Sequence, residues 1–259
     1  MYGRIFGISM LAVTMPPATA AAQQDFEWQG RVPPGQTIEI QGVNGDVRAV
    51  AASGDAVVVQ AQRRGRRDDP ASVRIEVVEH ADGVTICAVY PTPSNARREN
   101  ECAPGGGRNS VQRNDVRVDF LVRVPAGVRF EGVTVNGDVA AEGIAADVKA
   151  TTVNGDVDVR ATGVTEARTV NGSLNLYLGS TGFTENVRFE TVNGSITIEL
   201  PDGLNADFRA NTVNGSIESD FPITVTGRIN RRSIRGQIGR GGPELRLSTV
   251  NGSIRLRRI

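Results

Sequence analysis

Residues 187–200 read VRFETVNGSITIEL, and this stretch decides the fold. Apolar residues alternate with polar ones on both sides of its Val-Asn-Gly tripeptide, which predicts two half-buried β-strands. The two alternations are out of phase, because the step from Thr191 to Ile196 is odd, so one straight strand would turn one apolar set to solvent. The tripeptide is therefore predicted to be a corner. Asn and Gly suit a corner because they reach positive φ at little cost.

Val-Asn-Gly is the unit of an internal repeat. It occurs seven times, with its asparagine at Asn44, Asn136, Asn154, Asn171, Asn193, Asn214 and Asn251. From Asn136 to Asn214 the spacings are 18, 17, 22 and 21 residues, and the last spacing is 37 residues. Residues 233–238, SIRGQI, divide that last gap and are interpreted as a degenerate copy of the repeat, with Arg235 in place of the asparagine. Seven consecutive units of similar length are therefore predicted within residues 126–259.

Two architectures compete for this repeat. Asn-Gly is a strong hairpin signal, and successive hairpins would give an antiparallel meander or sandwich. Corners at this spacing would instead give a coil of parallel rungs, whose identical Thr, Asn, Gly and apolar positions stack at about 4.8 Å. Stacked Asn side chains can hydrogen-bond along such an axis. Because a meander gives no reason for one phrase to repeat in full, we predict an all-β fold, a β-solenoid (a single-stranded β-helix-like coil) of about seven rungs.

The preceding residues, 23–125, are predicted to form an irregular β region or cap with about five alternating strands. Its residues 41–47 resemble the later corners, which indicates that this region shares or caps the same core. Cys87 and Cys102 are 15 residues apart and are predicted to form a disulfide that holds the exposed loop 91–114; two free buried thiols are the alternative. Two Cys and one His cannot complete a four-ligand metal site, and no metal or cofactor is predicted.

The N-terminus has the pattern of an export signal. Residues 1–22 contain Arg4, an apolar stretch, and small residues ending in Ala20-Ala21-Ala22, which predicts a signal peptide cleaved near Ala22. A membrane anchor is the alternative, but the apolar stretch is short and Pro16-Pro17 interrupts it. The mature chain is therefore expected to be exported, to the periplasm or the cell surface.

Composition narrows the class of partner. The 29 basic and 29 acidic residues balance, so no global field favours nucleic acid. Arginines cluster at residues 63–67, 231–235 and 255–258, where they could bind an acidic polysaccharide or lipid headgroups, although a solvated surface is the more common outcome. The aromatic content of 5% argues against a groove in which aromatic rings stack on sugars.

Catalytic groups are few. His80 is the only histidine, so the common nucleophile–base triads cannot be assembled, and no catalytic residue is predicted. Asp138 and Asp156 follow the corner in adjacent rungs and would lie about 5 Å apart. Such a pair could share a proton, bind Ca²⁺ or hydrolyse a glycosidic bond, but two solvated corner charges are the more common outcome. Later rungs carry serine at this position.

The repeated phrase Thr-Val-Asn-Gly-(Asp/Ser)-(Val/Ile/Leu), the GVNGDV phrase at residues 42–47 and a Cys-containing strand ending in Tyr90-Pro91 resemble the bacterial putative-adhesin family of β-strand-repeat proteins. The resemblance covers roughly residues 26–259. It implies a β-solenoid exported to the cell envelope with no established enzymatic activity, and it supplies no binding residues. The sequence departs from the repeat at Ile234-Arg235-Gly236, where regular stacking is not expected.

We therefore expect a non-enzymatic envelope protein whose solenoid binds a partner, either an envelope protein or a polysaccharide. A carbohydrate-active β-helix enzyme and a sensor or accessory protein of an envelope-stress system are the alternatives. Because residues 255–259 directly follow the Asn251 corner, this rung is expected to form a bare end of the solenoid that can associate weakly with a second chain.

Overall fold

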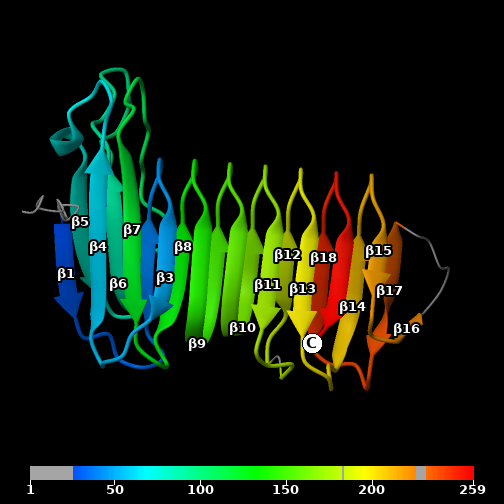
Figure 1. Ribbon diagram of the computed structural model, residues 1–259. Coiled ribbons are helices and arrows are strands. Elements are labelled where there is room, and N and C mark those ends of the chain that lie inside the picture. The colour runs from blue at the N-terminus through cyan, green and yellow to red at the C-terminus, as the bar shows by residue number, and fades with distance from the viewer. Residues whose placement is uncertain (1–25, 183, 226–231) are drawn as a thin grey trace, which may run out of the picture.

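The computed structural model describes residues 26–182, 184–225 and 232–259. The predicted signal peptide lies outside these described residues. The regular elements of the described chain are strands and one short 3-10 helix, η1 (Pro70–Ser72), and the chain coils into a two-layered rod with projecting corners along one long edge (Figure 1). The predicted all-β solenoid is thereby confirmed.

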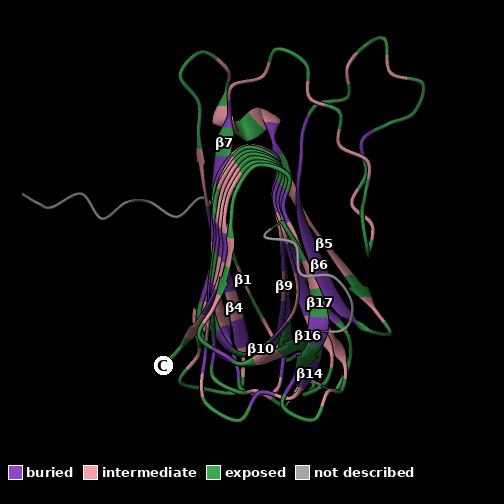
Figure 2. Ribbon diagram, turned by 90° about the vertical axis from the view of Figure 1, so that its right-hand side faces the viewer, coloured by how far each residue is buried: buried purple, intermediate pink, exposed green. Residues whose placement is uncertain are grey.

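Each rung consists of a strand, a corner and a second strand. We call the layer of strands that lead into the corners the first face, and the layer of strands that leave them the second face. Viewed along the rod, the corners stack as arches above two layers of partly and fully buried strands (Figure 2). In a representative rung Ile196, Ile198 and Leu200 point inward and are fully buried, whereas Thr197 and Glu199 point outward.

The first face is parallel in its middle and antiparallel at its two ends. Its spatial order is β5 (Arg74–His80), β6 (Gly83–Val89), β2 (Thr37–Gln41), β8 (Arg129–Val133), β9 (Val139–Thr151), β10 (Val157–Arg168), β12 (Val187–Glu190), β18 (Glu244–Ser248), β14 (Ala206–Asn211), β17 (Ser233–Ile238) and β16 (Ile223–Val225).

The second face contains the strands that follow the corners, with antiparallel strands at its N-terminal end. Its spatial order is β1 (Phe26–Gly30), β4 (Val57–Arg64), β7 (Arg117–Val124), β3 (Val47–Ala51), β9, β10, β11 (Leu174–Leu178), β13 (Ile196–Leu200), β19 (Ile254–Arg258) and β15 (Ile217–Ser219). Strands β9 and β10 appear in both faces because each crosses from the second face to the first, and register shifts mark the crossing.

The rungs do not follow one another in chain order. Strand β18 pairs in parallel with both β12 and β14, and β19 pairs in parallel with both β13 and β15. The Asn251 rung therefore lies between the Asn193 and Asn214 rungs. The expectation that it forms a bare end of the solenoid is wrong, because its two strands already have neighbours on both sides. Self-association through this rung loses its structural basis.

Residues 233–238 are not a degenerate rung, which corrects the interpretation of this segment. Strand β17 runs antiparallel to β14, and β16 runs antiparallel to β17. The two strands extend the first face beyond the Asn214 rung without turning a corner. The segment lacks the Thr and Asn side chains that hold the other corners together, and an antiparallel return satisfies its backbone instead.

The solenoid begins before residue 126. Strands β2 and β3 carry the Asn44 corner and pair in parallel with β8 and β9. Strands β6 and β7 add one more rung, in which residues 90–116 take the place of the corner. Antiparallel strands β5, β4 and β1 then close this end. The predicted cap and the repeats thus share one continuous pair of faces.

Candidate functional site

The seven corners, each with the Asp or Ser that follows it and, in six of them, the Thr that precedes it, form a straight line that we call the corner ridge (Figure 1). Asparagine side chains run along it as a continuous ladder. In each step the Nδ2 amide donates to the Oδ1 of the neighbouring asparagine at 2.7 or 2.8 Å. The ladder follows the spatial order Asn44, Asn136, Asn154, Asn171, Asn193, Asn251 and Asn214.

The backbone torsion expected for the corner asparagines is not observed. Among the described residues, Arg113 is the only non-glycine residue with positive φ, at 53°. The asparagine is therefore required by its side chain, which both donates and accepts within the ladder, and not by its φ. An aspartate or a leucine could not do both.

Glycine is required at the corner because the rungs approach closely there. A Cβ on Gly194 would overlap the carbonyl oxygen of Gly172, one rung away, and a Cβ on Gly172 would overlap that of Gly155. The same overlap recurs at the corner glycines Gly137, Gly155, Gly215 and Gly252. Only a residue without a side chain allows the backbones to stack at this distance.

A threonine precedes six of the seven corners and anchors each of them from inside; Gly42 takes this place at the Asn44 corner. Thr191 is 4% exposed, and its Oγ1 donates to the carbonyl oxygen of Gly172 on the neighbouring rung at 2.8 Å. Equivalent bonds of 2.8 to 3.0 Å are made by Thr134, Thr152, Thr169, Thr212 and Thr249. A buried hydroxyl needs such a partner, because an unsatisfied one costs free energy.

The residue after each corner glycine forms a third column. Asp156 N donates to Asp138 Oδ1 at 2.8 Å, and Asp138 N donates to Asp46 Oδ1 at 3.0 Å. The predicted carboxylate pair therefore lies side by side, and each carboxylate accepts a backbone N–H from the next rung. In the later rungs serine Oγ atoms accept the equivalent bond at 3.2 or 3.3 Å.

Asp119 extends this column and was missed by the sequence reasoning. Its Oδ1 accepts from Asp46 N at 3.0 Å. This is the same bond that Asp46 accepts from Asp138 N in the next rung. Arg117 Nη2 lies 3.3 Å from Asp46 Oδ1 and offsets the accumulated negative charge. No Val-Asn-Gly precedes Asp119, which lies within β7, so the repeat gives no signal of its role.

The corner valines form an exposed apolar row. Five of the six valines that follow a corner threonine are 37–39% exposed, and Val213 is 54% exposed. They are Val135, Val153, Val170, Val192, Val213 and Val250. The ridge thus presents parallel apolar and amide rows at the spacing of adjacent strands. Such a regular edge can contact an extended partner over several rungs.

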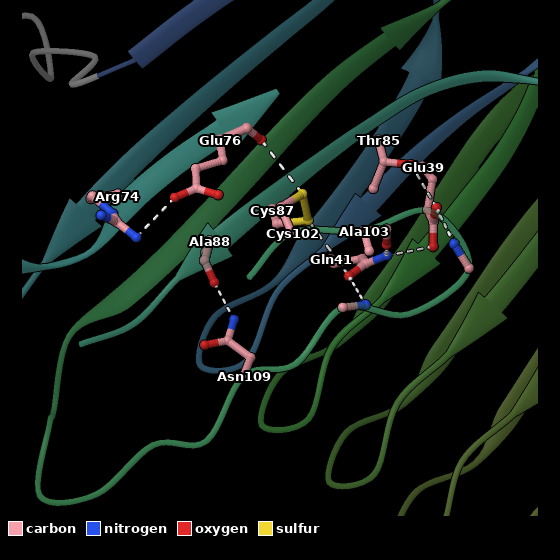
Figure 3. Close-up of a disulfide and its surroundings, with 12 residues drawn as sticks. Glu39, Gln41, Arg74, Glu76, Thr85, Cys87, Ala88, Cys102, Ala103 and Asn109 are labelled. Atoms are coloured by element: carbon pink, nitrogen blue, oxygen red, sulfur yellow. Dashed lines mark hydrogen bonds and ion pairs between the residues drawn. A yellow bond between two sulfur atoms is a disulfide. The ribbon is translucent and has the colours of Figure 1, made fainter. Parts of the chain in front are cut away.

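The loop after β6 covers the first face at its N-terminal end (Figure 3). Cys87 of β6 forms a disulfide with Cys102 of this loop, with their Cα atoms 5.6 Å apart. The loop also buries Glu39, whose Oε2 accepts from Thr85 Oγ1 at 2.8 Å and from Gly105 N at 3.0 Å. The disulfide and the carboxylate together hold the loop on the strands.

His80 takes part in this buried network. Its Nε2 lies 3.1 Å from Thr85 Oγ1. Because that hydroxyl donates its only hydrogen to Glu39, the Nε2–H of His80 must be the donor. The histidine thus supports the fold at the end of β5.

Two groups in the N-terminal loops have shifted pKa values. Backbone N–H groups of Asp68 and Arg67 donate to the Asp115 carboxylate and lower its pKa to about 2. Burial raises the pKa of Tyr90 to about 12, and its hydroxyl donates to the Val116 carbonyl at 2.6 Å. Both shifts arise from contacts that hold the base of a loop.

The part of the chain that the structure describes contains no group of three or more His, Cys, Asp or Glu side chains placed to hold a metal ion. None of its helices is long and apolar enough to cross a membrane.

The model of the Toastrack DUF4097 family matches residues 109–257. Among solved structures, the chain is similar to a putative cell adhesion protein from Clostridium sporogenes, with 11% identity, coverage of 90% of this chain and 99% of the other, and a TM-score of 0.46. It is also similar to a putative adhesin from Bacteroides fragilis, with 13% identity, coverage of 90% and 96%, and a TM-score of 0.28. No curated protein is detectably similar.

Proposed function

The chain belongs to the Toastrack DUF4097 family, and from this premise we propose that it is a non-enzymatic exported protein of the cell envelope whose solenoid binds a partner in adhesion or assembly. The observation that carries the proposal is the corner ridge. Its Asn ladder, Thr bonds and Gly contacts hold the exposed Val row in one line. A surface fixed in this way loses little conformational entropy when it binds.

The use of the corner carboxylates supports the non-enzymatic part of the proposal. Asp138 and Asp156 each accept a backbone N–H from the next rung, so both carboxylates already serve the stacking of rungs. The enzymatic alternative predicts turnover of an acidic polysaccharide that is lost in an Asp138→Asn/Asp156→Asn variant. Such turnover would contradict the proposal.

Export is supported by the disulfide between Cys87 and Cys102, because disulfides persist mainly in oxidising compartments. The test is fractionation of cells that express the full chain with a C-terminal tag. We expect the tagged protein in the periplasmic or surface fraction, with a mass that corresponds to cleavage near Ala22. An uncleaved protein confined to the cytoplasm would overturn the localisation.

Partner binding is tested on the ridge itself. We expect the mature protein, immobilised, to retain an envelope component that a Val153→Ser/Val170→Ser/Val192→Ser variant loses. These valines are exposed, so the variant should keep its fold. An Ile259→Ser variant is the matched control, because Ile259 is also exposed, at 51%, but lies off the ridge. Equal recovery by the ridge variant and the control would remove the ridge as the binding surface.

A further inference from the structure

Four arginines lie side by side on the outer surface of the first face. Arg188 of β12 is in register with Arg246 of β18, Arg246 with Arg209 of β14, and Arg209 with Arg235 of β17. Figure 1 shows these four strands in the half of the rod away from β1. Adjacent strands are about 4.8 Å apart. We call these four residues the arginine row.

The arginine row is largely unneutralised. Arg188 binds Glu190, which also binds Arg168 at 3.0 Å. Among the described residues, no ion pair joins Arg209, Arg235 or Arg246 to a carboxylate. The Nε of Arg246 is also buried without a hydrogen-bond partner.

Acidic side chains do lie nearby on the same face, two positions before the row. Asp207 accepts from Gln237 Nε2 at 3.2 Å, and Glu244 has an Oε1 that is buried without a hydrogen-bond partner. Neither carboxylate forms an ion pair with the row within the described part of the chain. Like charges directly opposite one another on neighbouring strands are destabilising. Like charges are expected to be kept on neighbouring strands, despite this cost in stability, where the residues bind a ligand.

The arginine row fits an extended polyanion better than a small single anion. Its arginines recur once per strand at positions that are in register, and a guanidinium group can form a fork with a carboxylate. Beside them, two positions toward the corner, Ser248, Asn211 and Ser233 lie in register and offer hydroxyl and amide groups. Acid groups at regular intervals, with hydroxyl groups between them, are the chemistry of a polyuronate. No aromatic side chain occupies these register positions to stack on a nucleic-acid base.

We propose that the arginine row is a binding site for an extended acidic polysaccharide whose carboxylates are spaced by single sugar units. The inference rests on the proposed function, because it names the chemistry of one partner of the exported solenoid. It places that partner on the first face and not on the corner ridge.

The chain order alone could not reveal this site. Arg188, Arg209, Arg235 and Arg246 are separated by 11 to 26 residues in the sequence. They come together only because β18 lies between β12 and β14, and because β17 returns antiparallel to β14.

The test is calorimetric titration of the mature protein with an oligogalacturonate long enough to span four strands, and with galacturonate monomer, at low and high salt. We expect the oligomer to bind at least about tenfold more tightly than the monomer, since the linked carboxylates bind together. Binding should weaken as salt rises. An Arg209→Gln/Arg246→Gln variant should bind the oligomer at least about tenfold more weakly.

The matched control is Arg255→Gln/Arg257→Gln. It removes the same charge from the second face, where both residues pair with Glu218. The control should bind like the wild type. The Arg209→Gln/Arg246→Gln variant should melt no lower than the wild type, because it removes like-charge repulsion.

Three outcomes overturn the inference. They are no binding of the oligomer at low salt, equal loss in the control and the row variant, and tighter binding of a single-stranded oligonucleotide of equal charge than of the oligogalacturonate. Failure here is distinguishable from failure of the proposed function. If the oligomer binds neither the wild type nor the row variant, but both proteins still recover the envelope component that depends on the ridge, the inference fails and the proposed function stands.

Discussion

At a single corner, three residues contact the neighbouring rung in different ways. Around Asn193, the Thr191 hydroxyl bonds the carbonyl of Gly172 from inside, and the amide of Asn193 bonds Asn171 from outside. The backbone of Gly194 lies against that of Gly172. The Thr, Asn and Gly of the phrase are therefore each fixed by a contact to another rung, which explains why these three recur almost unchanged.

The asparagine ladder predicts similar losses at Asn193 and Asn251, since both donate to one neighbour and accept from another. Replacement of either residue by alanine should lower the free energy of unfolding by about 1 to 2 kcal/mol. Asn214 ends the ladder, so Asn214→Ala should cost less. Urea titration of the three variants measures this. A loss at Asn251 as small as that at Asn214 would contradict its position inside the ladder.

Close stacking of the corners predicts that Gly194→Ala is destabilising, because the added methyl group overlaps the Gly172 carbonyl. Overpacking of this kind costs about 1 to 3 kcal/mol. Gly54→Ala is the matched control, since a Cβ at Gly54 meets nothing within 4 Å. Thermal unfolding should show a lower midpoint for Gly194→Ala alone. Equal midpoints for the two variants would rule out a steric role for the corner glycine.

The lowered pKa of Asp115 predicts a pH dependence. The carboxylate has a pKa of about 2 in the folded chain and an ordinary value of 3.8, so its contribution is complete above pH 4 and is lost as pH falls through about 2. Between pH 4 and pH 2 the urea midpoint of the wild type should therefore fall more than that of Asp115→Asn. A parallel decline of both proteins would show that the hydrogen bonds from Asp68 and Arg67 do not set this dependence.

At the scale of elements, the sequence predicts strands and corners well but does not predict all pairings. The out-of-phase alternation around Thr191 and Ile196 was sufficient for the corner, because only a corner keeps both apolar sets inside. The same reasoning misassigned residues 233–238. Alternation is equally compatible with a parallel rung and with an antiparallel return, and only the missing Thr and Asn contacts favour the second.

The loop after β6 is an element whose position depends on the disulfide. Cys102→Ser should lower the free energy of unfolding by about 2 to 4 kcal/mol, because the 15-residue loop is then unconstrained in the unfolded chain. Reduction of the wild type should produce a similar loss, measured by urea titration. Two thiols that react with an alkylating reagent without prior reduction would show that the disulfide does not form.

At the scale of the whole molecule, the candidate site was only partly predictable. The Asn ladder follows from stacked repeats, and Asp138 and Asp156 lie side by side as adjacent rungs require. The arginine row and Asp119 were not predictable, because their neighbours come from distant rungs or from a rung without a corner. Near-identical corners also carry no information about order, since any rung can stack on any other. The rung order is decided by the strands between the corners.

That order is the last prediction, and engineered cysteines can measure it. Thr197 of β13 is in register with Arg255 of β19, and Arg255 is in register with Glu218 of β15. A Thr197→Cys/Arg255→Cys pair lies on adjacent strands, about 5 Å apart, and should form a disulfide on mild oxidation. A Glu218→Cys/Arg255→Cys pair should do the same. A Thr197→Cys/Glu218→Cys pair is separated by β19, at about 10 Å, and should remain reduced.

Peptide mapping by mass spectrometry identifies the linked peptides while the Cys87–Cys102 disulfide serves as an internal standard. A coil in chain order would place β15 directly beside β13, and it would give the opposite result: Thr197→Cys/Glu218→Cys would link and Thr197→Cys/Arg255→Cys would not. The two arrangements bury the same kinds of side chains and form the same ladder of amides. The crosslinking pattern separates them because it reports which strands are neighbours.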